Sequence, residues 1–184
     1  YEADGDAEKL LKVLDIESEV AESPGEKIDR LEKALATAEG PLGAPERAYD
    51  YARRVFKEAV GDESIGRQRE TLERLTASTG RWAETQELYK ATAGDILDGD
   101  VQNETLLRIG ELAQTRLDKP EEAIEYYQKA LEARPDERRA LLALEALYEK
   151  QSDAKSLLEI LKKREEAAES DTERKELIFR QAEL

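Results

Sequence analysis

Apolar residues in this sequence recur at intervals of three and four, in segments that are separated by prolines and glycines. This spacing places apolar side chains on one face of an α-helix, whereas a half-buried β-strand needs strict alternation. All five prolines lie where a periodic segment starts or stops, as expected of a residue that is tolerated only in the first helical turn. The pattern predicts an all-α protein with about eight helices of roughly 12–18 residues and the start of a ninth.

Two short sequences predict helix starts: SPGE at 23–26 and SDTE at 170–173. Ser23 and Ser170 are the expected caps, because a serine hydroxyl there accepts a hydrogen bond from a backbone N–H of the first turn. Glu26 and Glu173 follow three residues later. We expect each glutamate to reach back to the N–H of its cap residue and complete a capping box.

The charge of the chain limits the partners that it can bind. Its 184 residues carry 29 basic and 44 acidic side chains, which gives a net charge of −15. Such a surface repels phosphate backbones and anionic lipid headgroups, and the sequence has no concentrated basic patch, so nucleic-acid binding is not expected. No apolar run reaches the roughly 20 residues of a membrane span, so direct membrane insertion is not expected either.

Three missing residue types bear on chemistry and origin. The chain has no Cys and no His, which excludes disulfides, zinc sites of the usual Cys/His kind and an imidazole base. It also has no Met and begins with Tyr1, which leads us to expect a piece of a longer protein. The compartment stays open. A soluble protein is expected, and the cytoplasm is slightly preferred.

The predicted helices come in self-similar pairs. Sequences that begin at Gly80, Asp118 and Ser152 align without gaps, at spacings of 38 and 34 residues. A period in this range indicates stacked two-helix units, none of which buries its apolar stripe alone. The sequence therefore predicts a single helical array over 1–184. Its expected units are 25–61, 64–99, 102–135 and 137–168, with half-units at 7–22 and 171–184.

Residues 104–165 resemble the tetratricopeptide repeat (TPR) family, in the divergent form that is common in large bacterial multi-repeat proteins. The resemblance rests on Gly110, Ala123, Tyr127, Ala130, Pro135, Leu141, Leu144 and Tyr148. Between 25 and 100 it is looser, and Glu145 replaces a small residue of the family pattern. The resemblance implies an α-solenoid of stacked antiparallel helix pairs, wound into a right-handed superhelix.

The resemblance also implies a non-catalytic scaffold that binds another protein or peptide in a concave groove, without a cofactor. The first helix of each unit lines that groove in the family. The groove candidates by alignment are Glu26, Asp29, Lys33, Arg69, Glu73, Glu104, Leu107, Glu111, Gln114, Arg139, Leu142 and Glu149. Their acidic bias favours a basic or amphipathic partner. The same charges fit a merely solvated helix face equally well.

A second reading is a structural spacer or a self-associating subunit that acts through its terminal or convex faces. The apolar faces near Leu10, Leu14, Leu177 and Phe179 are expected to be covered by neighbouring units, or by another copy that forms a homo-oligomer through the terminal helices. Trp82 either packs at the start of a helix or is an exposed anchor for a partner, and packing is the preferred interpretation.

The carboxylates of this sequence do not form a pattern that is typical of a catalytic or metal site. Adjacent pairs such as Glu121–Glu122 arise by chance in a chain this acidic, and they fit a solvated helix face, so no enzyme is expected. The sequence DILDGD at 95–100 does not match a calcium loop, because Gly94 would occupy the first ligand position. It is interpreted as a turn between helices, and no metal site is predicted.

Overall fold

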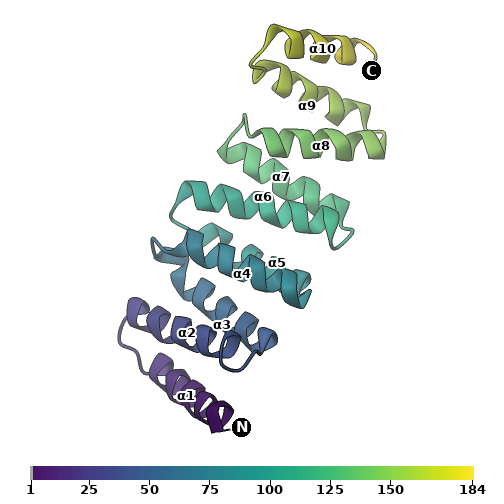
Figure 1. The fold of residues 1–184 in the computed structure, drawn as a ribbon. Coiled ribbons are helices and arrows are strands. Elements are labelled where there is room, and N and C mark those ends of the chain that lie inside the picture. The colour runs from purple at the N-terminus through teal and green to yellow at the C-terminus, as the bar shows by residue number, and fades with distance from the viewer. Residues whose placement is uncertain (1) are drawn as a thin grey trace. The chain divides into compact units, whose positions relative to one another are not determined.

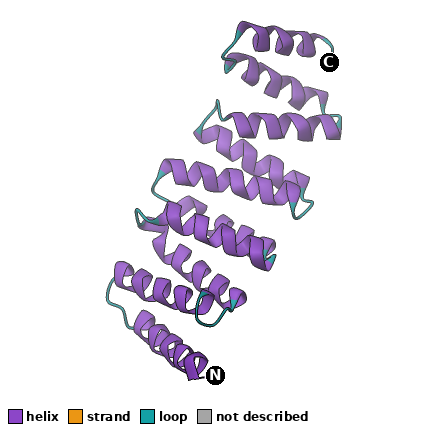
Figure 2. Ribbon diagram, in the orientation of Figure 1, coloured by secondary structure: helices purple, strands orange, loops and turns teal. Residues whose placement is uncertain are grey.

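The computed structural model describes the backbone of residues 2–184 and the side chains of residues 5–184. Within this part, 82% of the residues are helical and no strand is present (Figures 1 and 2). The all-α prediction is confirmed, and the described residues form ten α-helices, where about nine were expected. The helices are α1 (Glu2–Glu19), α2 (Pro24–Glu39), α3 (Pro45–Glu58), α4 (Ile65–Thr79), α5 (Trp82–Thr92), α6 (Gly99–Thr115), α7 (Pro120–Ala133), α8 (Arg138–Gln151), α9 (Ala154–Glu166) and α10 (Asp171–Ala182).

The helix starts follow the sequence signals closely. The hydroxyls of Ser23 and Ser170 each accept a hydrogen bond at 3.2 Å, from the backbone N–H of Glu26 and Glu173 respectively. The Glu26 carboxylate accepts from the N–H of Glu22 at 3.2 Å, one residue before the expected cap. The capping box is therefore shifted by one residue at α2, while the serine caps are as predicted.

Short breaks separate some of the helices. Two residues lie between α4 and α5, where Gly80 adopts a left-handed conformation with φ 72° that glycine accepts without strain. A break of the same length follows α8, where Ser152 has φ 56°. At the DILDGD sequence, the Asp98 carboxylate accepts from the N–H groups of Asp100 and Val101 at 2.8 and 3.0 Å. This sequence is a turn that leads into α6, as interpreted above.

The chain divides into two compact units, which are described separately: unit 1 up to Gln102 and unit 2 from Asn103 to Leu184. In unit 1 each of α1 to α4 packs against the next helix, and α3 also packs against α5. The apolar stripes of these helices meet in a shared core, in which the rings of Phe56 and Tyr89 lie 5.2 Å apart. The largest fully buried side chains of unit 1 are Leu11, Leu31, Tyr49, Phe56, Ile65, Leu72, Leu75 and Tyr89.

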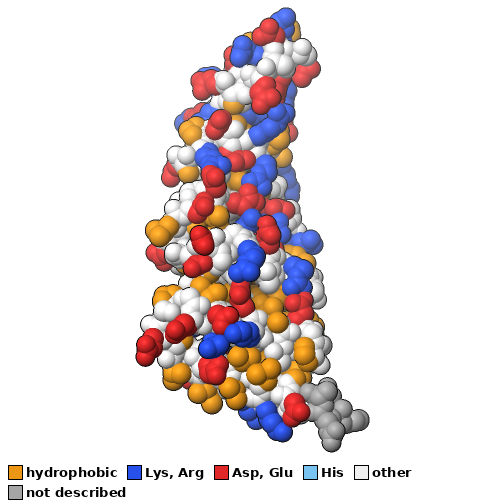
Figure 3. Space-filling view, turned by 60° about the vertical axis from the view of Figure 1, so that its left-hand side comes forward, with side chains coloured by type: hydrophobic (Ala, Val, Ile, Leu, Met, Phe, Trp, Pro, Cys, Tyr) orange, Lys and Arg blue, Asp and Glu red, His pale blue; other side chains and the backbone are white. Residues whose placement is uncertain are grey.

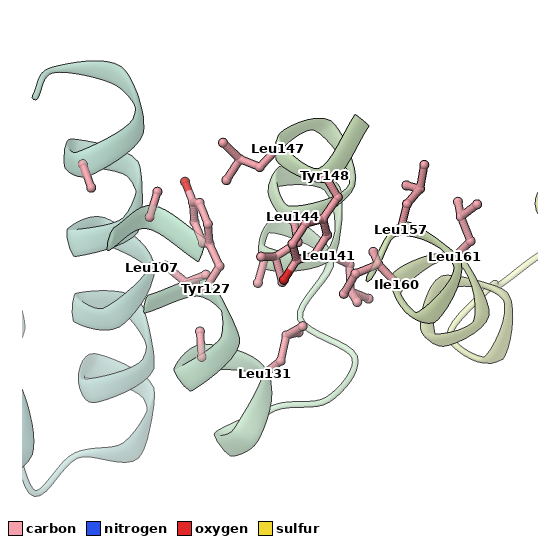
Figure 4. Close-up of a cluster of buried hydrophobic side chains, with 14 of the residues drawn as sticks. Leu107, Tyr127, Leu131, Leu141, Leu144, Leu147, Tyr148, Leu157, Ile160 and Leu161 are labelled. Atoms are coloured by element: carbon pink, nitrogen blue, oxygen red, sulfur yellow. The ribbon is translucent and has the colours of Figure 1, made fainter. Parts of the chain in front are cut away.

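Unit 2 is also built by contacts between successive helices. Helices α7, α8, α9 and α10 pack in chain order. Figure 4 shows how their side chains point toward one another across the helix pairs. The core includes Leu107, Tyr127, Leu131, Leu141, Leu144, Leu147, Tyr148, Leu157, Ile160 and Leu161. Among the described helices, none combines the length and the hydropathy that crossing a membrane requires.

Candidate interaction surface

Arginine–carboxylate ion pairs join helices that lie two apart in the chain of unit 1. Arg47 of α3 pairs with Glu8 of α1 at 2.5 Å, and Arg54 pairs with Asp15 at 2.6 Å. Each of these two pairs spans 39 residues, and they are seven residues, about two helical turns, apart on both helices. Because the offset is constant, α1 and α3 run parallel with a fixed register.

The same arrangement connects α2 with α4. Arg67 pairs with Glu32 at 2.8 Å, and Arg74 pairs with Glu39. Both pairs span 35 residues and are again seven apart. These charged side chains, which the sequence analysis did not single out, thus form contacts between alternate helices.

In unit 2, ion pairs link α6 to α8 and α8 to α10 at the same offset. Arg139 of α8 binds Glu104 of α6, and Arg180 of α10 binds Glu145 of α8, each across 35 residues. Glu145 also binds Arg164 of α9 and is only 7% exposed. The residue that departs from the TPR pattern is therefore a buried carboxylate between two arginines.

Five groove candidates lie in unit 1, and one of them, Glu26, accepts a hydrogen bond from the N–H of Glu22 at the start of α2. Asp29 and Lys33 form an exposed pair on α2 at 2.7 Å. Arg69 and Glu73 form a largely shielded pair on α4 at 3.1 Å, and the Tyr89 hydroxyl donates to Glu73 at 3.3 Å. These five side chains are engaged within their own unit.

Seven candidates lie in unit 2, and most of these are also engaged. Glu104 pairs with Arg139, and Glu149 with Arg180. Glu111 pairs with Arg108 at 2.6 Å. Gln114 accepts a hydrogen bond from the Tyr127 hydroxyl at 3.1 Å.

The two leucine candidates, Leu107 and Leu142, lie in different environments. Leu107 is 4% exposed and belongs to the core of unit 2, so its assignment to a partner-binding groove is wrong. Arg139 of α8 reaches Glu104, one helical turn before Leu107, so this side of α6 faces α8 and not solvent. Leu142 is 42% exposed, although Leu141 beside it is buried.

The ion pairs and the packing shift several pKa values. Hydrogen bonding to Glu104 raises the pKa of the Arg139 guanidinium, and hydrogen bonding from Arg74 lowers the pKa of the Glu39 carboxyl. Burial raises the pKa of the Tyr127 hydroxyl to about 12, with a further contribution from the negative charge of Glu111. At neutral pH these pairs are fully charged and Tyr127 is neutral.

Two hollows that were not predicted from the sequence each lie between the second helices of two successive predicted pairs. In unit 1 a hollow of about 570 Å³ lies between α3 and α5, with Arg53 and Lys57 on one wall and Leu88 on the other. In unit 2 a hollow of about 300 Å³ involves Gln128 and Glu132 of α7 and Ile160 of α9. The residues that line the two hollows occupy equivalent positions when Pro45 is aligned with Pro120 and Gly80 with Ser152. Their charges differ, since α3 contributes two basic side chains and α7 none.

The remaining candidates fall into buried and exposed sets. Leu14 and Leu177 are buried within their units. The expectation that they belong to faces open to a neighbouring unit or another copy is therefore wrong for these two residues. Leu10 and Phe179 are exposed. Trp82 is half-buried at the start of α5.

No protein-family model matches this sequence. The search of curated proteins also finds no match.

Proposed function

We propose that the chain is an α-solenoid of TPR-like helix pairs and that it serves as a non-catalytic scaffold for protein–protein interaction. The support is the recurring offset of the ion pairs between alternate helices, which is 39 residues between α1 and α3 and 35 residues at α2–α4, α6–α8 and α8–α10. These offsets lie close to the spacings of 38 and 34 residues in the sequence. A stack that repeats one helix pair offers an extended surface, and each pair contributes the same face to it.

The proposed binding face is centred on Leu142 of α8. Arg139, Leu142 and Glu149 are spaced by three and seven residues, which places them on one face of the helix. Leu142 is the partly exposed apolar member, and ion pairs to α6 and α10 lie at either side of it. An apolar contact inside a ring of charged groups is the usual arrangement of a small interaction site.

The chemistry of this face favours a basic, amphipathic helix as partner. One apolar side chain of the partner would cover Leu142, and its Lys or Arg residues would share the carboxylates of Glu104 and Glu149 with the arginines that bind them now. Because these carboxylates are partly exposed to solvent, salt screens their attraction for a basic partner, and binding is expected to weaken with added salt.

The test is a selection of helical peptides on the immobilised protein, followed by fluorescence anisotropy of the recovered peptides. Leu142→Ser should weaken their binding about tenfold or more, a loss of about 1.4 kcal/mol. Leu97→Ser is the matched control, since Leu97 is 82% exposed and lies outside this face. Recovered peptides that are acidic, or that bind both variants equally, would contradict the proposed site.

A second function, self-association through the terminal helices, is favoured by a separate observation. Apolar side chains are exposed along α1 and α10 and not only at Leu142. This alternative does not depend on peptide binding at α8.

A further inference from the structure

Large exposed apolar side chains concentrate on the first and last helices. Those on or directly after α1 and on α10, each at least 47% exposed, are Leu10, Val13, Ile16, Val20, Ile178 and Phe179. In Figure 3 hydrophobic side chains gather over unit 1 toward the N-terminus. An apolar stripe of this length on a surface helix is typical of a site that another helix covers.

Helix α1 has two distinct apolar faces. Ala7, Leu11 and Leu14 are buried against the rest of unit 1. The exposed stripe that runs from Leu10 to Val20 follows a spacing of three and four, and at 100° per residue it covers about 120° of the helix circumference. This second stripe faces away from α2.

Helix α10 repeats this situation in unit 2. Leu177 is buried at 2% exposure against α9. Ile178, Phe179 and Ala182 are exposed, and their spacing of one and three residues places them together on the opposite face. The helix therefore also has a second apolar face.

Interior helices of each unit show what normally covers such a face. Helix α3 packs against α2 on one side and against α4 on the other. Helix α9 likewise lies between α8 and α10. In the described part of the chain, α1 packs against the helix that follows it and α10 against the helix that precedes it. The face that α1 exposes is thus the kind that a preceding helix covers, and the face of α10 is the kind that a following helix covers.

We propose that a second copy of the chain covers both exposed stripes, with α10 of one copy packed antiparallel against α1 of the next. This inference rests on the self-association alternative and not on the binding face at α8. The charges beside the two stripes support the antiparallel orientation. Lys175 near the start of α10 would lie opposite Glu19 at the end of α1, and Glu183 would lie opposite Lys12.

The proposed contact is head-to-tail, because it joins two different surfaces. Each associated copy keeps one free α1 face and one free α10 face, so assembly continues into open chains unless the rotation closes a ring. An antiparallel pairing of two α1 faces would also place Lys12 opposite Glu19, but it would stop at a symmetric dimer.

The experiment is sedimentation velocity on the full chain over about 5 to 500 µM, a range that covers weak association. The variants are Ile16→Asp, Phe179→Asp and the control Leu97→Asp, which changes an exposed leucine outside both stripes. Wild type and the control should increase in mass with concentration. Each stripe variant alone should stay monomeric, because one of the two faces that it needs is lost.

Mixing gives the decisive result. Ile16→Asp retains the α10 face and Phe179→Asp retains the α1 face, so an equimolar mixture should form a one-to-one dimer and nothing larger. Self-association of either variant alone, or a mixture that stays monomeric, would overturn the proposal. A monomeric wild type over the whole range would overturn it too.

The charge register gives an independent check with folded variants. Lys175→Glu should weaken association about tenfold. Combining it with Glu19→Lys in one chain should restore association, because each contact between copies then again joins opposite charges. Peptide binding at Leu142 is measured on the same samples. Loss of association with intact peptide binding, or the reverse, shows that the contact between copies and the binding face at Leu142 are independent, and it shows which of the two proposals fails.

Discussion

The ring of Tyr127 lies directly against the backbone of Gly110: a methyl group built on Gly110 would be 2.9 Å from Cε1 of the tyrosine. The contact joins α6 to α7, the two helices of one predicted repeat unit. The contact therefore pairs a residue without a side chain on α6 with an aromatic ring on α7.

Gly110→Ala should therefore destabilise the protein by about 1–3 kcal/mol, because the tyrosine ring must move. In an open helix position the same change is expected to stabilise by about 0.5–1 kcal/mol. Gly66→Ala on α4 is the control, since a methyl group there would meet Val101 at an ordinary 3.8 Å. Urea unfolding measures both variants. A stability gain from Gly110→Ala would contradict the close contact.

Tyr127→Ala should lower the free energy of unfolding by an amount on the order of 3 kcal/mol, because it leaves a cavity between the paired helices. With the ring removed, Gly110→Ala should no longer destabilise. A double-mutant cycle over the two positions measures this coupling. Additive effects would show that the two residues do not interact as described.

Glu145→Ala should cost roughly 3 kcal/mol, because it leaves the Arg164 and Arg180 side chains without their shared carboxylate in a partly buried site. Glu149→Ala is the matched control, since Glu149 binds the same Arg180 but is half exposed. Removing an exposed partner should cost about 0–1 kcal/mol. Equal losses for the two variants, measured by thermal unfolding, would contradict the buried role of Glu145.

Alkaline pH should unfold the protein partly through Tyr127. Burial raises its pKa to about 12 from the ordinary value of 10.0. The neutral hydroxyl is therefore favoured in the folded state, and its contribution is complete below pH 10 and is lost as the pH rises toward 12. Tyr127→Phe should show a smaller fall in stability over this interval. An identical alkaline profile for wild type and variant would argue against the shift.

The helices and their caps were largely readable from the sequence, because they depend on neighbours within a few residues. Ser23 together with Pro24 predicts α2, and Ser170 predicts α10, from local chemistry alone. The shift of the Glu26 contact to Glu22 was not readable, since it depends on how the preceding residues enter the helix.

The surface was predicted less well, because it depends on which helices face one another. Leu107 was placed in a groove, but the stacking of α8 beside α6 covers it. The ion pairs were missed for the same reason. A signal did exist: Glu32 and Glu39 are seven residues apart, and Arg67 and Arg74 repeat that spacing 35 residues later.

The proposed scaffold is an open stack in which neighbouring helix pairs cover one another's apolar stripes. Small-angle X-ray scattering of Phe179→Asp, extrapolated to zero concentration, tests it most directly. A compact globule of this length has a radius of gyration of about 16 Å. Helix layers about 10 Å apart predict roughly 20 Å or more, with an elongated distance distribution. A value near 16 Å with a single symmetric peak would contradict the account.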